Sequence, residues 1–357
     1  MLILIGCIIL SSSCGFTAFI GEPGWAQYPF QELARIPIEE NSGSYLSWAI
    51  VDDAASGTVI FDMYDYASLT DQFYYWDGTS LLETTFPNAV YLYEMISMEG
   101  PGQFITVEYD TNYFLRLYKA TETGNGTASI TMEQEILFDI ADFPGLTGGT
   151  ITNIHYAGGR VYGQCPDSAA GAVTVLSYAV DDNGFSDPSI ELSAMNFSEV
   201  DAAYFTEANA LEQTFWHSTD VSIEGFRFYP DSEAALFACT KGLAPGNEEY
   251  NAVIQWDGTD HTGETAAEYT DSTSFYFLQD TSFIETGTAK YPVSHRILNL
   301  SMEELGVITD IDNIEYIGDG IIDDEHVLFY LYDSLTDGSG DELLFLYIPV
   351  ASVAGGV

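Results

Sequence analysis

The chain has 357 residues, of which 46% are apolar and 14% aromatic, so it has ample material for a large core and is not a disordered polymer. It carries 55 acidic and 8 basic side chains, for a formal net charge of −47. Binding to nucleic acids and to anionic lipid surfaces needs clustered Lys and Arg, so this charge excludes both as partners.

The N-terminus begins with a short apolar run at residues 2–10, followed by Ser11, Ser12, Ser13, Cys14 and Gly15. A run of this length is too short to span a bilayer as a helix and is typical of the hydrophobic core of an export signal. The ending Ser-Ser-Ser-Cys-Gly resembles the lipobox of bacterial lipoproteins. The resemblance implies that residues 1–14 are a signal segment and that Cys14 carries a lipid. It also implies an exported protein of the cell envelope, in the periplasm or at the cell surface, which meets the membrane only through that anchor. A cleaved signal without lipid, giving a secreted protein, is the alternative.

Two further cysteines, Cys165 and Cys239, lie in the remainder of the chain. Export permits a disulfide between them. Cys239 ends the apolar run 235–239, which equally suits a buried free thiol. Both interpretations stay open at the level of sequence.

Residues 15–43 are rich in Pro, Gly and Glu and are interpreted as a tether or lead-in, and residues 44–357 as one repetitive domain. In that domain, short aromatic or β-branched segments alternate with turns that contain Gly, Asp, Asn or Ser, which predicts strands. No segment shows sustained apolar spacing of three and four, so the fold class is all-β. The clearest predicted strands are 58–64, 72–76, 90–96, 103–109, 113–119, 172–180, 252–256, 295–300, 326–332 and 343–349.

A weak repeat runs through these strands: an apolar segment ends at an aromatic residue, often before an acidic turn. The aromatic positions are Trp76, Tyr118, Tyr178, Trp256 and Tyr347, and Trp-Asp-Gly-Thr occurs at both 76–79 and 256–259. The Asp-Gly pair favours a type I′ hairpin, in which both central residues adopt positive φ.

These features resemble β-propeller repeat proteins in general, which implies four-stranded blades around an axis. At roughly 49 residues per blade, the chain beyond Cys14 corresponds to about seven blades. Six or eight blades, or two β-sandwiches divided near residue 200, are the alternatives. The long gap between Tyr178 and Trp256 predicts a further, degenerate unit around 226–241. Residues 33–38 are predicted to supply the strand that closes the ring against the last blade.

Candidate sites are few. Asp337, Ser339 and Asp341 place oxygen side chains at alternate positions, as at the start of a calcium loop, and are the candidate ligands of a structural calcium ion. The sequence contains no fingerprint of a metalloprotease, a serine hydrolase, a P-loop or a dinucleotide site, so no catalytic residue is assigned. His155, His217, His261, His295 and His326 are scattered and are expected to be structural. Trp76 and Trp256 are expected to pack between blades, whereas Trp216 is a candidate surface residue.

The working hypothesis is a non-catalytic binding or scaffold protein of the cell envelope, with a protein or glycan partner, an unidentified ligand and no cofactor other than calcium. One alternative is a glycan-active propeller hydrolase or lyase, in which carboxylates converge with a Tyr or His in the central funnel. A second alternative is a structural envelope protein whose charge is an adaptation to high salt.

Overall fold

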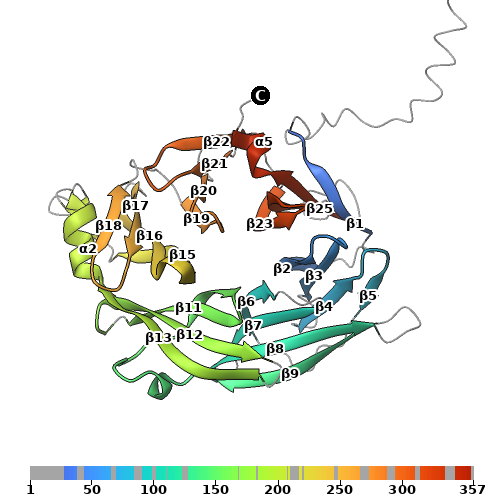
Figure 1. The fold of residues 1–357 in the computed structure, drawn as a ribbon, viewed down its shortest axis with the longest axis horizontal. Helices are drawn as coiled ribbons and strands as arrows, with labels where there is room; N and C mark the ends of the chain where they lie inside the picture. Colours follow the sequence, from blue (N-terminus) through green and yellow to red (C-terminus); the bar gives the residue numbers. More distant parts are fainter. Residues whose placement is uncertain are drawn as a thin grey trace, which may run out of the picture.

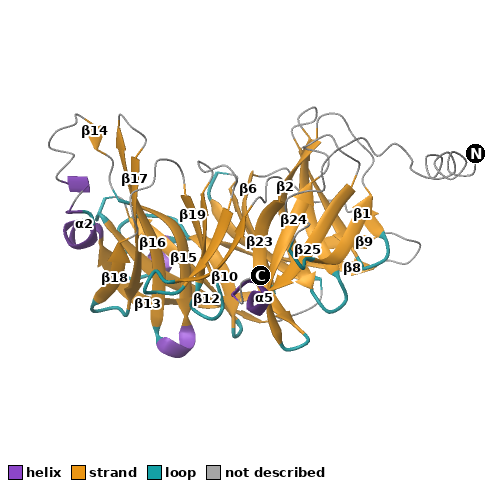
Figure 2. Cartoon of the chain, turned by 90° about the horizontal axis from the view of Figure 1, so that it is seen from above, coloured by secondary structure: helices purple, strands orange, loops and turns teal. Residues whose placement is uncertain are grey.

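The computed structural model describes residues 28–37, 44–65, 70–83, 91–98, 102–109, 111–122, 128–167, 169–181, 184–206, 208–209, 217–218, 221–244, 248–265, 273–287, 294–309, 314–333 and 342–354. Their strands form six antiparallel sheets around a central axis, which makes the fold a six-bladed β-propeller (Figure 1). Seen from the side, the strands cross the thickness of the ring (Figure 2). None of the helices within these ranges is long and apolar enough to cross a membrane.

The blades follow one another in chain order, each beginning with its innermost strand. The first blade consists of β2 (Ser44–Asp53), β3 (Thr58–Asp65), β4 (Thr70–Trp76) and β5 (Leu81–Glu83). The second consists of β6 (Tyr91–Ser97), β7 (Gln103–Tyr109), β8 (Tyr113–Glu122) and β9 (Ala128–Leu137). The third consists of β10 (Thr152–Ala157), β11 (Arg160–Asp167), β12 (Ala172–Asp181) and β13 (Gly184–Asn196). The fourth blade consists of β15 (Ser222–Tyr229), β16 (Ala234–Ala244), β17 (Glu248–Trp256) and β18 (His261–Thr265), and the short β14 (His217–Ser218) also pairs with β16. The fifth blade consists of β19 (Thr273–Phe277), β20 (Phe283–Gly287), β21 (Ser294–Leu298) and β22 (Glu304–Thr309). The sixth blade consists of β23 (Ile314–Ile322), β24 (Glu325–Asp333), β25 (Glu342–Pro349) and β1 (Gln31–Pro37). The helical segments between and after the strands are η2 (Ile140–Asp142), α2 (Phe197–Tyr204), η3 (Pro230–Ser232) and α5 (Val350–Ala354).

The prediction of seven blades was wrong, and the alternative of six is the one observed. The aromatic repeat itself was real, because all five anchor residues lie on third strands, namely β4, β8, β12, β17 and β25. The error arose in the gap before Trp256. Residues 226–241 span the end of β15, the connecting η3 and most of β16, in the same blade as Trp256, and form no blade of their own. The gap is long because β13 has 13 residues and α2 is inserted before the next blade.

The last blade combines the two ends of the described chain. β1 pairs antiparallel with β25, in a register that runs from Gln31 opposite Tyr347 to Pro37 opposite Glu342. Residues 33–37 of the predicted closing strand therefore do close the ring. Covering β25 in this way removes an edge strand that would otherwise be open to pairing with another chain.

Apolar side chains fill all six interfaces between neighbouring blades. In β3, Val59 and Phe61 pack toward the last blade, whereas Ile60 packs toward the second blade. Because both faces of the middle strands are buried, these strands have continuous apolar sequences instead of an alternating pattern. The core is therefore a ring of six layers, and the inner strands line the axis.

The two Trp-Asp-Gly-Thr segments form the same turn. The Oδ1 atom of Asp77 accepts hydrogen bonds from the amides of Thr79 and Ser80, each at 2.7 Å. Within this turn only Gly78 takes a positive φ, of 92°, so the turn is not the expected type I′ hairpin. Asp257 and Gly258 repeat the arrangement.

Trp256 occupies the interface between the third and fourth blades. It is 6% exposed, and its Nε1 donates to the carbonyl oxygen of Ser193 at 2.9 Å. Trp76 is partly buried at the interface between the first and last blades. The expected packing role of these two tryptophans is confirmed.

Candidate functional site

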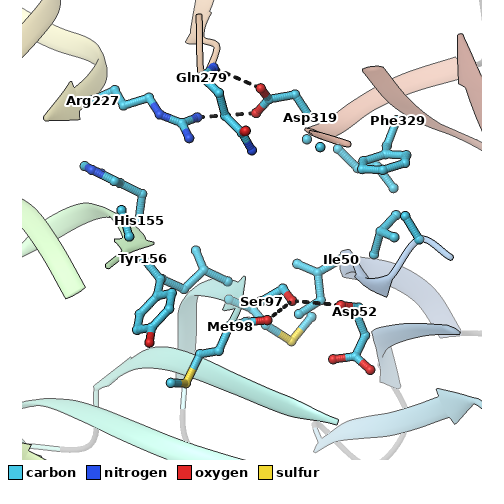
Figure 3. Close-up of a pocket in the computed structure, with 18 of the residues that line it drawn as sticks. Ile50, Asp52, Ser97, Met98, His155, Tyr156, Arg227, Gln279, Asp319 and Phe329 are labelled. Atoms are coloured by element: carbon cyan, nitrogen blue, oxygen red, sulfur yellow. Dashed lines mark hydrogen bonds and ion pairs between the residues drawn. The ribbon is translucent and has the colours of Figure 1, made fainter. Parts of the chain in front are cut away.

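Two cavities lie on the propeller axis and meet at a common waist. The first, here called the hairpin cavity, measures about 590 Å³ and lies where the inner strands turn into the second strands (Figure 3). The second, here called the glutamate cavity, measures about 500 Å³ and lies toward the starts of the inner strands. Residues shared by both linings form the waist: Ile50, Met95, Ile96, His155, Arg227, Ile317, Gly318 and Asp319.

Polar side chains of the inner strands reach the backbone of the next blade. The Oδ2 atom of Asp52 in the first blade accepts from the amide of Gly102 in the second blade at 2.8 Å. The Glu94 carboxylate in the second blade accepts from the amides of Asn153 and Ile154 in the third, both at 2.5 Å. Asn153 has a positive φ of 52°, and the two successive amides meet one carboxylate there, as in anion-binding backbone nests.

The third and fourth blades continue this series. The Nε2 atom of His155 lies 3.0 Å from the carbonyl oxygen of Phe228 in the fourth blade. The Nη1 atom of Arg227 in the fourth blade donates to the carbonyl oxygen of Phe277 in the fifth at 3.1 Å. Each of these contacts runs from one blade to the next in the same direction around the ring.

Asp319 joins the last three blades. Its carboxylate accepts from Nη1 of Arg227 at 3.3 Å and from the backbone amide of Gln279 at 2.9 Å (Figure 3). It also contacts Nε2 of His326 at 2.8 Å, and Nδ1 of that histidine lies 3.6 Å from Asp280. The side chain of Asp319 is only 5% exposed, whereas that of Asp280 is 48% exposed, so the group is shielded from water at Asp319 and open to it at Asp280.

Four titratable groups in or beside the channel have shifted pKa values. Burial raises the pKa of Glu94 to about 7, against the opposing effect of its two amide donors. Hydrogen bonds to Asp280 and Asp319 raise the pKa of His326 to about 9. Burial lowers the pKa of His155 to about 3, which keeps that imidazole neutral. The hydrogen bond from His326 holds the pKa of Asp280 well below its usual range.

The mouth of the glutamate cavity combines aromatic rings with carboxylates. Tyr276 is 38% exposed, and its ring centroid lies 4.9 Å from that of Tyr316 at a tilt of 52°. Burial, and after it the negative charge of Glu315, raises the pKa of Tyr276. Glu224 and Glu315 are exposed, and Trp48 also lines this cavity. Such a lining suits groups that stack on aromatic faces and interact with carboxylates.

Several residues singled out in the sequence lie outside the described ranges, namely Cys14, Trp216, Asp337, Ser339 and Asp341. Cys165 and Cys239 are buried free thiols, and burial raises the pKa of each to about 12. The free-thiol interpretation is therefore the one observed. Across the ranges that the structure describes, no cluster of three or more His, Cys, Asp and Glu side chains is arranged to hold a metal ion.

The histidines are held by neighbouring groups. His261 contacts the hydroxyl of Tyr204 at 3.1 Å, and His295 contacts that of Tyr330 at 3.3 Å. His155 and His326 belong to the contacts between blades described above. The structural role expected for these four agrees with their contacts, and the side chain of His217 is outside the described set.

Sequence reasoning missed the residues of the channel. Glu94 and Glu315 cannot be distinguished by local pattern from the other acidic residues of the chain. Arg227 did carry a signal, because it is one of 8 basic residues and stands between Phe226 and Phe228 inside an apolar strand. A charge at such a position indicates a buried ion pair or a functional site.

No protein-family model matches the chain, and no curated protein matches it in sequence. Solved structures of similar backbone include TolB from Acinetobacter baumannii, at 9% identity, 87% coverage of this chain and a TM-score of 0.37. The chain spans 65% of the length of that TolB chain. The Dos1 propeller matches at 9% identity, 86% of this chain, 78% of its own and a TM-score of 0.40. The GH93 α-L-arabinofuranosidase of Fusarium graminearum, solved with arabinobiose, matches at 8% identity, 91% of this chain, 99% of its own and a TM-score of 0.47. Similarity at this level transfers no function to the chain.

Proposed function

We propose that the chain is a non-catalytic binding protein of the cell envelope that holds its ligand in the glutamate cavity. The proposal rests on a difference between the polar residues inside the channel and those at the mouth of the glutamate cavity. Asp52, Glu94, His155 and Asp319 each contact the backbone of a neighbouring blade and so serve the fold. At the mouth, in contrast, exposed Tyr276 and two exposed glutamates border a cavity of about 500 Å³. Propellers commonly bind partners at such a rim.

The location rests on the N-terminal segment. Its apolar run and the Ser-Ser-Ser-Cys-Gly ending support export and attachment through Cys14. The net charge of −47 supports a partner that is not a nucleic acid. Export and lipidation are tested by metabolic labelling of the expressed protein with a fatty acid. Label is expected on the native chain and not on Cys14→Ser.

Binding is tested with the chain from Gly15 onward on peptide and glycan arrays. We expect a ligand whose retention is lost in Tyr276→Ala. Ile321→Ala is the matched control, because Ile321 is 53% exposed and lines neither axial cavity. Equal retention by the native chain and Tyr276→Ala would contradict the proposed site.

A second candidate is hydrolysis or cleavage of a glycan, and one observation favours it. The pKa of Glu94, at about 7, is suited to a general acid, and Glu94 lines the same cavity as Tyr276 and Glu315. Release of reducing sugar from polysaccharides, abolished in Glu94→Gln, would establish this activity. The absence of release across a broad polysaccharide panel would leave binding as the function.

A further inference from the structure

We propose that Arg227 binds the carboxylate of an aliphatic acid at the waist of the channel, through the edge of its guanidinium group that carries Nε and Nη2. The carbon chain of the acid extends into the hairpin cavity. Tyr276 does not line that cavity, so this site differs from the mouth described under the proposed function and does not depend on it.

Arg227 differs from the other four arginines of the chain in its hydrogen bonds. In each of those four, Nε donates to a side chain of the same blade, and the pairs are Arg35 with Glu32, Arg116 with Glu135, Arg160 with Ser177 and Arg296 with Glu304. Arg227 uses Nη1, which donates to the carbonyl oxygen of Phe277 at 3.1 Å and to Asp319 at 3.3 Å. Within the described part of the chain, neither Nε nor Nη2 of Arg227 has an acceptor.

The two free nitrogens form one planar edge with parallel N–H groups. Such an edge matches the two oxygens of a carboxylate and binds them in a bidentate, geometrically specific pair. The side chain of Arg227 is 20% exposed, and donors left unpaired at a partly buried site cost free energy that an acceptor recovers. The contacts of Nη1 with the fifth and sixth blades hold the free edge in one orientation before a ligand arrives (Figure 3).

The waist has room for a ligand beside this edge. Arg227 lines both axial cavities, and the hairpin cavity measures about 590 Å³. Gly318 follows the bulge of β23 at the waist, and a Cβ atom there would meet nothing within 4 Å beyond its chain neighbours. Ile50, Ile96 and Ile317 add apolar surface at the same level. A carboxylate with an aliphatic chain suits both parts of this lining, whereas an inorganic anion would leave the apolar part uncovered.

The ion pair of Arg227 does not by itself repel an anion. Its partner Asp319 also contacts His326 at 2.8 Å, and hydrogen bonds to Asp280 and Asp319 raise the pKa of that histidine to about 9. At neutral pH two cations therefore share two carboxylates, and this group carries no net charge.

The other acidic groups of the channel lower the affinity for an anion at low salt. Asp52 and Glu94 accept from backbone amides of the next blade. The remaining acids of the two linings are Glu224, Asp231 and Glu315. Their repulsion, and that of the net charge of −47, acts over a distance and is screened by salt, whereas the contact at Arg227 is short and partly buried. Salt should therefore strengthen carboxylate binding here, the opposite of its effect on a surface ion pair.

The test follows the five Nε–H signals of the arginines by NMR. It uses ¹⁵N-labelled chain from Gly15 onward, which contains every residue that the structure describes. We expect hexanoate to shift the Arg227 signal and leave the other four in place. Hexanamide lacks the charge and one acceptor oxygen, and should bind at least about 10-fold more weakly. Acetate should also bind at least about 10-fold more weakly, because it buries little apolar surface. Sodium chloride raised from about 20 to about 150 mM should tighten hexanoate binding.

Two variants test the edge and the space beside it. Arg227→Lys keeps a positive charge near Asp319 but has no planar edge, and should weaken hexanoate at least about 10-fold. Ile96→Phe leaves the guanidinium group intact and narrows the waist, and should weaken hexanoate about 5-fold or more. Ile321→Ala, outside both cavities, should change nothing. Circular dichroism checks the folding of each variant. If Arg227→Lys does not fold, the Arg227 signal is assigned through correlations with its own backbone, and Ile96→Phe carries the test.

The inference would be overturned by an unmoved Arg227 signal at millimolar hexanoate, by equal affinities for hexanoate and hexanamide, or by hexanoate binding that is unchanged in the folded variants at Arg227 and Ile96. Weaker binding at higher salt would also contradict it, because that result indicates exposed surface cations. The proposed function fails separately, since it is tested by the loss of an array ligand in Tyr276→Ala. Either result can fail while the other holds.

Discussion

Asp319 and His326, seven residues apart on the hairpin of the last blade, are joined through Oδ2 and Nε2 at 2.8 Å. The same carboxylate binds the fourth blade through Arg227 and the fifth blade through the amide of Gln279. The contact between Asp319 and His326 therefore lies at a junction of three blades. The strength of this contact depends on whether the imidazole of His326 is protonated.

Stability is expected to fall as the pH rises from about 6.5 to about 9. His326 has its pKa raised from 6.5 to about 9, so the folded chain binds this proton more tightly than the unfolded chain. Its contribution is complete below pH 6.5 and is lost as the pH rises through 9, which amounts to about 3 kcal/mol. Urea unfolding at pH 6 and pH 9.5 measures the difference. His326→Gln should flatten this part of the pH profile, and an unchanged profile would contradict the assignment.

Replacing Glu94 is expected to weaken the junction between the second and third blades. Glu94→Ala leaves the amides of Asn153 and Ile154 without their acceptor, at an expected cost of about 1–3 kcal/mol. Glu94→Gln keeps one acceptor oxygen and should cost less. Because burial raises the pKa of Glu94 to about 7, ionisation between pH 4.5 and 7 destabilises the native chain. Thermal unfolding at pH 5 and pH 8 should show Glu94→Gln closer to the native chain at pH 8.

Gly225 is expected to tolerate no side chain. A Cβ atom at this position would lie 2.5 Å from the backbone oxygen of Phe275 on the neighbouring inner strand. Gly225→Ala would push β15 and β19 apart, at a cost of about 2 kcal/mol or more in urea unfolding. Gly148→Ala is the matched control, since its Cβ would meet Asp167 at an ordinary 3.5 Å. Similar unfolding midpoints for the two variants would show that the blades can separate at little cost.

Removal of the closing strand is expected to destabilise the whole ring. A chain that begins after residue 37 loses the ladder with β25 and the burial of Ala34 and Ile36, which are 6% and 0% exposed. The expected loss is about 3 kcal/mol or more, accompanied by aggregation through the open edge of β25. Thermal unfolding and light scattering compare this chain with one that begins at Tyr28. A monodisperse, equally stable shorter chain would show that β1 is dispensable.

Salt is expected to raise the unfolding temperature. Arg35, Arg116, Arg160, Arg227, Lys241 and Arg296 all form ion pairs within the chain. Because the chain has a net charge of −47, the charge in excess of these ion pairs is negative. Screening by salt relieves the repulsion among these negative groups. Calcium chloride and sodium chloride are compared at equal ionic strength. An additional gain from calcium that disappears in Asp337→Asn would assign the predicted site at Asp337, Ser339 and Asp341, and equal gains would indicate screening alone.

The sequence by itself determined the all-β class, the repeat and the closing strand. These follow from local properties: aromatic and β-branched segments form strands, and the Asp-Gly pairs at 77–78 and 257–258 form turns between strands. Trp76, Tyr118 and Tyr178 marked the third strands of the first three blades for that reason. The count of blades was lost because it depends on the length of β13 and on the insertion of α2, which local pattern does not reveal.

Only the tertiary structure decided what the acidic residues do. Glu94 meets Asn153 across 59 residues of sequence, and Arg227 meets Asp319 across 92. Closure of the ring brings these groups to one axis, and burial there gives otherwise equivalent carboxylates different roles. Glu94 and Asp319 hold blades together, whereas Glu315 lies exposed beside Tyr276 at the mouth of a cavity. A chain with 55 acidic residues offers no local signal for that distinction, because it arises from long-range contacts and from exclusion of water.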